Sequence, residues 1–419
     1  MGDRLKRILG NNRTVAVNFS WLVALEFFVL LSPLVTYPYL IRTVGMELYG
    51  TVVFAQVIVT YVSLVVNFGF NLTGAKEIAS NLANPDKISE IVSSVFINKF
   101  AIWLVCFFVY LLMISSFSFF SEHYALYFFS FFLTLNELLF PIWFYQGIEK
   151  MKYVTCVNVA IRLFFIGAIF IFVRQETDYI YVPVLNSAGA VLAGIASLYI
   201  LLRVEKVKLI AVSKERLNFY FKEALPLFVS SLSIRIYQNA NKIVVGSFLG
   251  MSEVAIFDLG EKLVSLIKIP VSLIAQAVFP KISRERSVGY LNKVMMLALG
   301  LSVFGYLAMA LGASFIIHIF LDDTMQDSAW VIRILGLSAI FSSLNFFLGS
   351  NRLIPFGYKN LYMKIMLVNS MFYLCLALFM ITFGIMNLYT ISSLLVIVEI
   401  FNLVLLSFSC NRNKILFNK

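Results

Sequence analysis

Polar and charged residues recur at helical spacing within two apolar stretches of this 419-residue chain. Residues 222–248 carry one set, which comprises Ser231, Arg235, Gln238, Asn239 and Lys242. Residues 254–279 carry the other, which comprises Asp258, Glu261, Lys262 and Lys268. Steps of three and four residues place each set along one side of a helix. The basic side chains could bind an anion, because a guanidinium matches phosphate oxygens with paired hydrogen bonds.

The composition identifies the environment of these side chains. The chain is 61% hydrophobic and 13% charged, whereas a soluble domain is roughly 45–50% apolar and about 25% charged. Its mean hydropathy is +0.90. The chain is therefore predicted to be an all-α integral membrane protein. The net charge of +11 has to be interpreted by position along the chain, and we expect no nucleic-acid partner.

About twelve apolar runs approach the roughly 20 residues that cross a hydrocarbon core of about 30 Å. They are residues 14–36, 48–72, 92–115, 124–146, 154–173, 179–202, 222–248, 254–279, 293–320, 328–351, 361–383 and 386–409. The longest polar connection lies near the middle of the chain. We expect an N-terminal six-helix lobe in residues 1–205, a basic linker in 206–222 and a C-terminal six-helix lobe in 223–419.

The basic residues of the connections predict the orientation. Apart from Arg42 and Arg174, the Lys and Arg residues outside the spans lie on the same side as both ends of the chain. Positive charge is retained on the cytoplasmic side, so both termini are expected there. The polar start and the long first apolar run also argue against a cleavable signal peptide.

The two halves share a repeated segment. "PYLIRTVGMELYG" (38–50) resembles "VVGSFLGMSEVA" (244–255) when Gly45 is placed on Gly250. The same offset superposes Gln56 on Glu261, and Thr60 on a serine. Six spans separate the copies, so the halves have the same orientation. This arrangement is typical of transporters whose two similar lobes move around a central cavity.

Eight basic residues fall inside the predicted spans, namely Lys99, Arg162, Arg235, Lys242, Lys262, Lys268, Arg333 and Lys364. Each would cost about 2.5–3.5 kcal/mol if it faced lipid at mid-depth, so most should face water or acidic partners. The acids within spans are Glu26, Glu137, Asp258, Glu261 and Glu399. The excess of bases predicts a cationic cavity. Lys99 could instead be a paired or snorkelling structural charge.

Buried carboxylates beside these bases could bind and release protons during transport, because desolvation and neighbouring cations change carboxyl pKa values in opposite directions. Glu26, Asp258 and Glu261 are the candidates for this ion or proton coupling. Simple neutralisation of Lys262 by Asp258 and Glu261 is the alternative.

The remaining motifs argue against several classes of function. Four cysteines stand singly in apolar runs, so no metal site or cofactor is expected. No P-loop motif occurs, so the chain is not expected to hydrolyse ATP by a P-loop mechanism. Asp322, Asp323 and Asp327 resemble an aspartate-rich magnesium and diphosphate site, but they fall on the side opposite the basic connections. This position argues against a membrane enzyme of prenyl-phosphate glycan chemistry. The enzyme is kept as the alternative from a different class, and no catalytic residue is assigned.

Several segments resemble one family. These are "PYLIRTVGMELYGTVVFAQ", "NFGFNLTGAKEIA", "ELLFPIWFYQGIEKMKYVTCVNVAIRLFFI" and "FPKISRE". They are similar to the Wzx-type flippases of O-antigen and capsule export, in the multidrug/oligosaccharidyl-lipid/polysaccharide (MOP) exporter superfamily. The resemblance implies two lobes of six helices around a V-shaped cavity. It also implies a cargo, an oligosaccharide on undecaprenyl pyrophosphate, that moves from the cytoplasmic to the periplasmic leaflet of the bacterial inner membrane.

The resemblance and the polar faces together give the expected site. Arg162 matches a basic position of the family, whereas Arg235 and Lys242 come from the helical spacing. With them we expect Gln238, Asn239, Lys262, Lys268, Gln56 and Thr60 to line the cavity. Arg42 could meet cargo at the periplasmic mouth or contact a lipid headgroup. Trp143 and Tyr145 are expected to anchor the fourth span at the membrane interface.

We therefore expect a flippase that works by alternating access and is driven by coupling to an ion gradient or, alternatively, by the gradient of its own cargo. A multidrug exporter of the same superfamily is the alternative among transporters. The expected partners are the lipid-linked oligosaccharide and membrane lipids, with a polysaccharide polymerase and a chain-length regulator as further partners. The chain is expected to act as a monomer.

Overall fold

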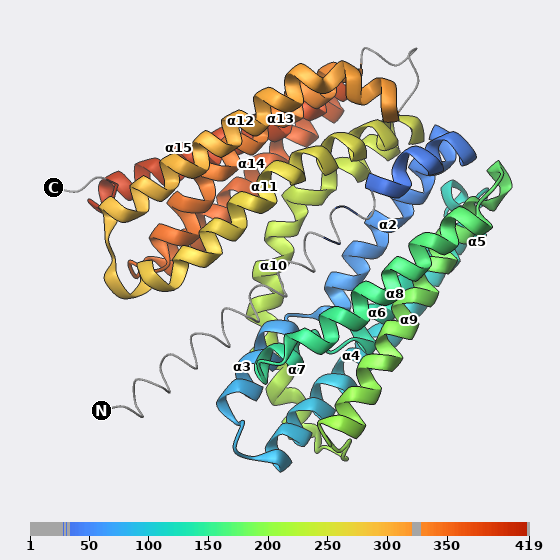
Figure 1. Ribbon diagram of the computed structural model, residues 1–419, viewed down its shortest axis with the longest axis vertical. Helices are drawn as coiled ribbons and strands as arrows, with labels where there is room; N and C mark the ends of the chain where they lie inside the picture. Colours follow the sequence, from blue (N-terminus) through green and yellow to red (C-terminus); the bar gives the residue numbers. More distant parts are fainter. Residues whose placement is uncertain (1–27, 29–30, 32–33, 321–327, 417–419) are drawn as a thin grey trace. The chain divides into compact units, whose positions relative to one another are not determined.

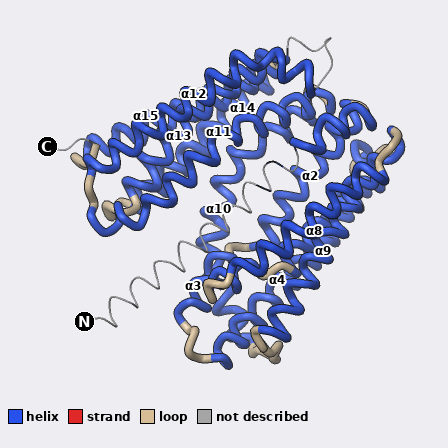
Figure 2. The backbone as a smooth tube through the Cα atoms, in the orientation of Figure 1, coloured by secondary structure: helices blue, strands red, loops and turns tan. Residues whose placement is uncertain are grey.

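The computed structural model describes residues 28, 31, 34–320 and 328–416, and within them it contains helices and loops but no strand (Figures 1 and 2). Residues 34–44 are helical. The α-helices that follow are α2 (Met46–Asn67), α3 (Phe70–Ser80), α4 (Pro85–Ser116), α5 (Tyr124–Phe131), α6 (Leu135–Leu139), α7 (Ile142–Gly147), α8 (Met151–Phe172), α9 (Tyr181–Tyr199), α10 (Lys214–Phe248), α11 (Met251–Glu285), α12 (Val288–Phe320), α13 (Ala329–Leu348), α14 (Lys359–Thr382) and α15 (Leu388–Arg412).

The prediction of an all-helical membrane protein is confirmed. Within the described residues, ten helical segments are long and apolar enough to cross a membrane, and they correspond to ten of the twelve predicted spans. Of the other two, residues 14–36 lie almost entirely outside the described residues. Residues 222–248 form part of the 35-residue helix α10. This helix is long enough to span a membrane, but it carries many polar side chains and is not among the ten apolar segments.

The chain forms two compact units. The first comprises Met1–Thr36 and Ala55–Leu232, and the second comprises Tyr37–Phe54 and Ser233–Lys419. These units differ from the expected lobes, because their boundaries fall inside α2 and α10 and not in residues 206–222. Each of these two helices therefore begins in one unit and continues into the other.

The core of the first unit explains why the N-terminal part of α10 belongs to it. Tyr220 and Ala224 of α10 are buried in the same cluster as Phe68 and Phe70. The ring of Phe68 stacks on that of Phe228, with centroids 4.6 Å apart. This apolar packing fixes the start of α10 on the first unit.

Two glycines allow α3 and α7 of the first unit to approach closely. A Cβ on Gly74 would lie 2.6 Å from the Trp143 ring, and one on Gly147 would lie 2.7 Å from Ile78. Trp143 and Tyr145 are each only 1% exposed, and the Tyr145 hydroxyl donates to the Ser197 carbonyl oxygen at 2.5 Å. The prediction that both side chains are interfacial anchors is wrong, because the space left by Gly74 admits Trp143 to the core.

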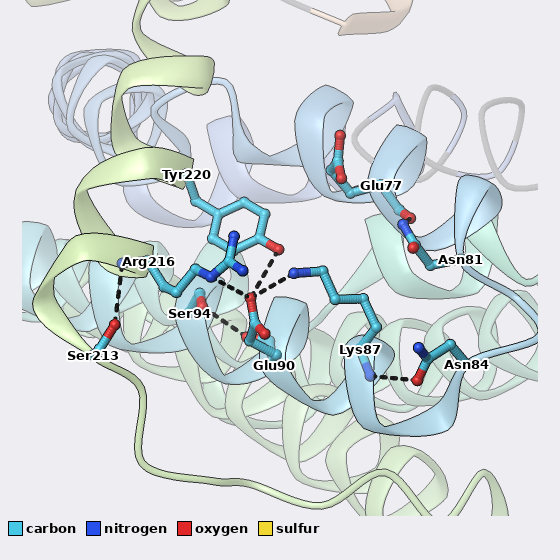
Figure 3. A network of polar contacts seen from close by, with 9 residues as sticks. All are labelled: Glu77, Asn81, Asn84, Lys87, Glu90, Ser94, Ser213, Arg216 and Tyr220. Carbon is cyan, nitrogen blue, oxygen red and sulfur yellow. Dashed lines mark hydrogen bonds and ion pairs between the residues drawn. The ribbon is translucent and has the colours of Figure 1, made fainter.

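The segment before α10 is fastened to α4 within the first unit. The backbone N–H groups of Lys208 and Ile210 donate to the hydroxyls of Ser89 and Ser93, at 3.2 and 2.9 Å. Figure 3 shows the neighbouring polar network, which is centred on the carboxylate of Glu90. This carboxylate lies 2.7 Å from Lys87, 3.5 Å from Arg216 and 3.5 Å from the Tyr220 hydroxyl, which donates to it.

Polar contacts also hold the helices of the second unit together. Asn351, in the π-helical turn Gly349–Leu353 that follows α13, donates to the Ala275 carbonyl oxygen at 2.6 Å, which ties this turn to α11. The Ser302 and Ser343 hydroxyls lie 2.5 Å apart between α12 and α13. These internal bonds satisfy polar groups that lipid could not.

Candidate functional site

The two copies of the repeated segment adopt related backbone geometry in the second unit. Gly45 has φ 84° and immediately precedes α2, and Gly250 has φ 133° and immediately precedes α11. Both values lie in the region that favours glycine. The alignment of Gly45 with Gly250 therefore corresponds to two equivalent helix starts.

Ion pairs around the buried Asp258 connect α10 to α11 and link two residues within α11. The Lys242 ammonium lies 2.7 Å from Asp258 Oδ1 and 2.9 Å from Glu261 Oε2. The Lys262 ammonium lies 2.5 Å from Asp258 Oδ2. These four residues, which we call the charge cluster, contain two bases and two acids. Their formal charges therefore cancel.

Aromatic hydroxyls and rings complete the surroundings of Lys262. Its ammonium donates to the Tyr49 hydroxyl at 2.9 Å and lies 5.2 and 5.5 Å from the ring centroids of Tyr37 and Tyr49. The Tyr37 hydroxyl donates to the Ala255 carbonyl oxygen at 2.7 Å. Cation–π attraction and hydrogen bonds thus hold this ammonium in the interior of the second unit.

A pocket of about 400 Å³ lies beside the charge cluster, between α10, α11, α13, α14 and α15. Its polar lining includes Asn239, Glu261, Lys268, Asn345, Glu399 and Asn402. Lys268 lies 3.6 Å from Glu399, and the Asn345 amide donates to the Glu399 carboxylate at 2.7 Å. With two acids and one base, this lining has no excess of positive charge.

Other predicted residues of the second unit have different surroundings. Arg235 is exposed on α10, and Gln238 lies on the same helix, although its side chain is outside the described part. Arg42 donates through Nη2 to the Ile319 carbonyl oxygen at 2.9 Å, at the end of α12. A cation in this position interacts favourably with a helix C-terminus.

The remaining predicted residues belong to the first unit or are not described. On α2, the Thr60 hydroxyl donates to the Gln56 carbonyl oxygen at 2.8 Å. On α8, Arg162 Nε donates to Asn158 Oδ1 at 2.8 Å. Glu26 lies outside the described residues.

Lys99 belongs to a polar centre in the first unit, whose other members the sequence analysis did not connect with it. Its side chain is 1% exposed, and its ammonium donates to Asn71 Oδ1 at 3.0 Å and to the Glu137 carbonyl oxygen at 3.1 Å. The Glu137 carboxylate in turn accepts from Asn67 at 2.8 Å. Snorkelling is therefore wrong for Lys99, and its role as a hydrogen-bonded structural charge is the alternative that the geometry fits. The four-residue spacing of Asn67 and Asn71 was the available signal.

Comparison with known proteins identifies the family. Residues 15–285 match the family described as "Polysaccharide biosynthesis protein". The chain belongs to this family. It is 26% identical to a protein of Escherichia coli (strain K12) named "Putative O-antigen transporter", over 85% of this chain and 88% of the relative. A protein of the same name from Shigella dysenteriae is also 26% identical, over 83% of this chain and 88% of the relative.

Solved structures show the same fold. An inward-facing multidrug resistance MATE family transporter of the MOP superfamily matches with a TM-score of 0.61 at 16% identity, over 92% of this chain and 98% of the other. An outward-facing structure of a transporter of the same description matches with a TM-score of 0.61 at 16% identity, over 95% and 93% of the two chains. The chain is thus a multi-pass membrane protein with a MOP transporter fold.

The enzyme alternative is not supported. Both curated relatives are named as transporters, and the two solved structures with the same fold are transporters of the MOP superfamily. The aspartates Asp322, Asp323 and Asp327, on which the alternative depended, lie outside the described residues.

Proposed function

We propose that this transporter flips an oligosaccharide linked to undecaprenyl pyrophosphate, such as an O-antigen or capsule repeat unit, from the cytoplasmic to the periplasmic leaflet by alternating access. The observation that carries this proposal is the similarity to two proteins named as O-antigen transporters over more than four-fifths of this chain. The MOP fold supports it, because that fold serves transport across a membrane.

The pyrophosphate is the part of this cargo that calls for basic groups. Arg235 offers an exposed guanidinium on α10, which also carries Asn239 and Lys242. We assign pyrophosphate contact to Arg235, because guanidinium groups make paired bonds to phosphate oxygens. Arg162 of the first unit is a separate candidate for phosphate contact in this proposal. Gln238, Asn239, Gln56 and Thr60 are further cargo contacts in this proposal.

The charge cluster has a different task, because its lysines are already held by carboxylates. Protonation of Glu261 would remove one of the two negative charges beside Lys242 and weaken its hold on that ammonium. Lys242, and through Asp258 also Lys262, could then attract the pyrophosphate. Asp258 and Glu261 therefore couple ion or proton binding to cargo binding in this mechanism. Lys268 is paired with Glu399, and in this proposal protonation of that carboxylate would likewise make the Lys268 ammonium available to the cargo.

The site of action proposed is the bacterial inner membrane, with both termini in the cytoplasm. A polysaccharide polymerase would consume the flipped unit, and a chain-length regulator would act with it. The flippase itself works as a monomer in this proposal, since each chain contains two compact units.

Deletion of the gene in its own bacterium tests the function. Surface polysaccharide should be lost, and completed lipid-linked oligosaccharide should accumulate in the cytoplasmic leaflet. The wild-type gene should restore both, whereas Arg235→Ala should not, at equal abundance of protein in the membrane. Normal surface polysaccharide in a deletion strain with no second flippase gene would overturn the proposal.

A multidrug exporter is the second candidate, because both solved neighbours described above are multidrug transporters and the pocket of the second unit includes two acids. Cationic amphiphiles would suit such acids. Under this alternative the deletion strain would keep its polysaccharide and become more sensitive to cationic drugs.

A further inference from the structure

The pocket of the second unit contains buried hydrogen-bond acceptors that nothing in the described structure satisfies. Asn402 is 3% exposed and Asn345 is 8% exposed. Among the described residues, neither Asn402 Oδ1 nor Asn345 Oδ1 has a hydrogen-bond partner. Buried amide oxygens are rarely left without a donor. A molecule that enters this pocket could therefore donate hydrogen bonds to both of these amide oxygens.

The other polar groups of the pocket add to this excess of acceptors. The NH2 group of Asn345 already donates hydrogen bonds to the carboxylate and the carbonyl oxygen of Glu399. The Ser265 hydroxyl, also in the lining, donates to the Glu261 carbonyl oxygen at 2.8 Å. The carboxylates of Glu261 and Glu399 can only accept when ionised. Lys268, Ser338, Ser342 and Tyr362 also carry donors in the lining, but the Oδ1 atoms of Asn402 and Asn345 have no partner among the described residues. These two atoms favour a ligand that donates hydrogen bonds.

This preference selects among the chemical groups of the proposed cargo. Pyrophosphate oxygens are acceptors and carry negative charge. They could pair with the Lys268 ammonium of the lining, but they could not satisfy the Asn402 and Asn345 amide oxygens and would be repelled by the Glu261 and Glu399 carboxylates. An inorganic cation would be repelled by the ammonium groups of Lys268 and Lys242, which lie 3.6 Å from Glu399 and 2.9 Å from Glu261. Sugar hydroxyls and acetamido N–H groups are uncharged donors, and they meet neither difficulty.

We infer that this pocket is a glycan subsite, in which Asn402 and Asn345 accept hydrogen bonds from hydroxyl or acetamido groups of the cargo's sugar portion. The inference rests on the proposed function and deepens it by separating the sugar subsite from the pyrophosphate contacts. The volume of about 400 Å³ lies at the lower end of the roughly 300–1,000 Å³ of ligand pockets. Tyr362 also lines the pocket, and an aromatic ring can pack against the C–H groups of a sugar.

Asn369 provides a matched control for Asn402. It is a buried asparagine of the same unit, 1% exposed, and its amide also lacks hydrogen-bond partners among the described residues. It lies on α14 and not in the lining of the pocket. Asn402→Leu and Asn369→Leu therefore remove the same chemical group at similar burial, but only the first removes a pocket acceptor.

The test uses the full-length purified chain in detergent and three probes, which are the host's oligosaccharide repeat unit released from its lipid, inorganic pyrophosphate, and sodium chloride with choline chloride as its control. Wild type and Asn369→Leu should bind the released oligosaccharide equally. Asn402→Leu should bind it about tenfold more weakly, as expected for the loss of one buried hydrogen bond of about 1.4 kcal/mol. Pyrophosphate affinity should be the same in all three proteins.

Two results would overturn the glycan subsite. Equal oligosaccharide binding by Asn402→Leu and wild type would exclude Asn402 as a sugar contact. Sodium binding that Asn402→Leu abolishes, without an effect on the oligosaccharide, would make this a cation site. Both results are distinct from failure of the proposed function, which the deletion strain tests separately. If the wild-type gene restores surface polysaccharide there, the proposed function holds whichever binding result is found.

Discussion

Gly50, in the first copy of the repeated segment, packs directly against the backbone of Met251, in the second. A Cβ at Gly50 would lie 1.7 Å from the Met251 carbonyl oxygen, so the two helix starts could not approach as closely with any other residue. A second close contact lies nearby, since a Cβ at Gly246 would lie 2.4 Å from the ring of Phe54 on α2. The two copies thus contact each other within the second unit.

Substitution of Gly50 should disrupt this contact. We expect Gly50→Ala to lower the free energy of unfolding by about 1–3 kcal/mol, because the backbone must shift to relieve the overlap. Thermal stability of the detergent-solubilised chain, followed by size-exclusion chromatography, measures the effect. Gly300→Ala on α12 is the control, since its Cβ would meet no atom within 4 Å. Equal stability of the two variants would contradict the close approach.

The charge cluster predicts a rescue. Lys242→Met should destabilise the chain by about 1–3 kcal/mol, because it leaves the half-buried Glu261 carboxylate without its cation. Asp258 would still be paired with Lys262. Adding Glu261→Gln should therefore recover most of the lost thermal stability. A double variant as unstable as Lys242→Met would show that Glu261 is not the group left uncompensated.

Lys99 should contribute to stability through its hydrogen bonds within the first unit. Lys99→Ala leaves two buried acceptors, on Asn71 and Glu137, without a donor, so we expect a loss of about 1–3 kcal/mol. Lys364→Ala, at an exposed position of α14, should change stability by less than about 0.5 kcal/mol. The comparison uses the same thermal assay, and equal effects would argue against a structural role for Lys99.

The segment ahead of α10 should become easier to cleave when its hydrogen bonds to α4 are removed. Ser89 and Ser93 each accept one backbone N–H from this segment. Each bond contributes about 1 kcal/mol, so Ser93→Ala should raise the rate of tryptic cleavage at Lys206 and Lys208 about fivefold. The combined variant with Ser89→Ala should raise it further.

Ser80→Ala is the control for that cleavage experiment. Its hydroxyl bonds only within α3, to the Lys76 carbonyl oxygen, so the rate should not change. Identical rates in Ser93→Ala and Ser80→Ala would contradict the attachment of the segment to α4.

The network around Glu90 illustrates a limit of the sequence as a guide. The spacing of Lys87 and Glu90 allows an i, i+3 pair on one helix, and that pair forms. Nothing local indicates that Arg216 and Tyr220, more than 120 positions away, meet the same carboxylate. Their contact depends on how α10 packs against α4.

Trp143 and Asn402 show the same limit in apolar and polar side chains. A tryptophan near the end of an apolar run is typical of a membrane interface, but Gly74, on a different helix, provides the space that buries Trp143. Asn402 has no distinctive neighbours in the sequence. Only the meeting of α15 with α11 and α13 makes it part of a pocket.

The sequence by itself determined the membrane environment, ten spans close to their observed bounds, the paired glycine starts at Gly45 and Gly250, and the Asp258–Lys262 pair within one helix. These features depend on the apolar length needed to cross lipid, on backbone conformation and on helical spacing, which are all local. The tertiary structure decided which acid holds Lys242, how Lys99 is satisfied, and which side chains line the pocket. Those outcomes depend on contacts between helices distant in the chain, because a buried polar group pairs with whichever partner packing brings within hydrogen-bond distance.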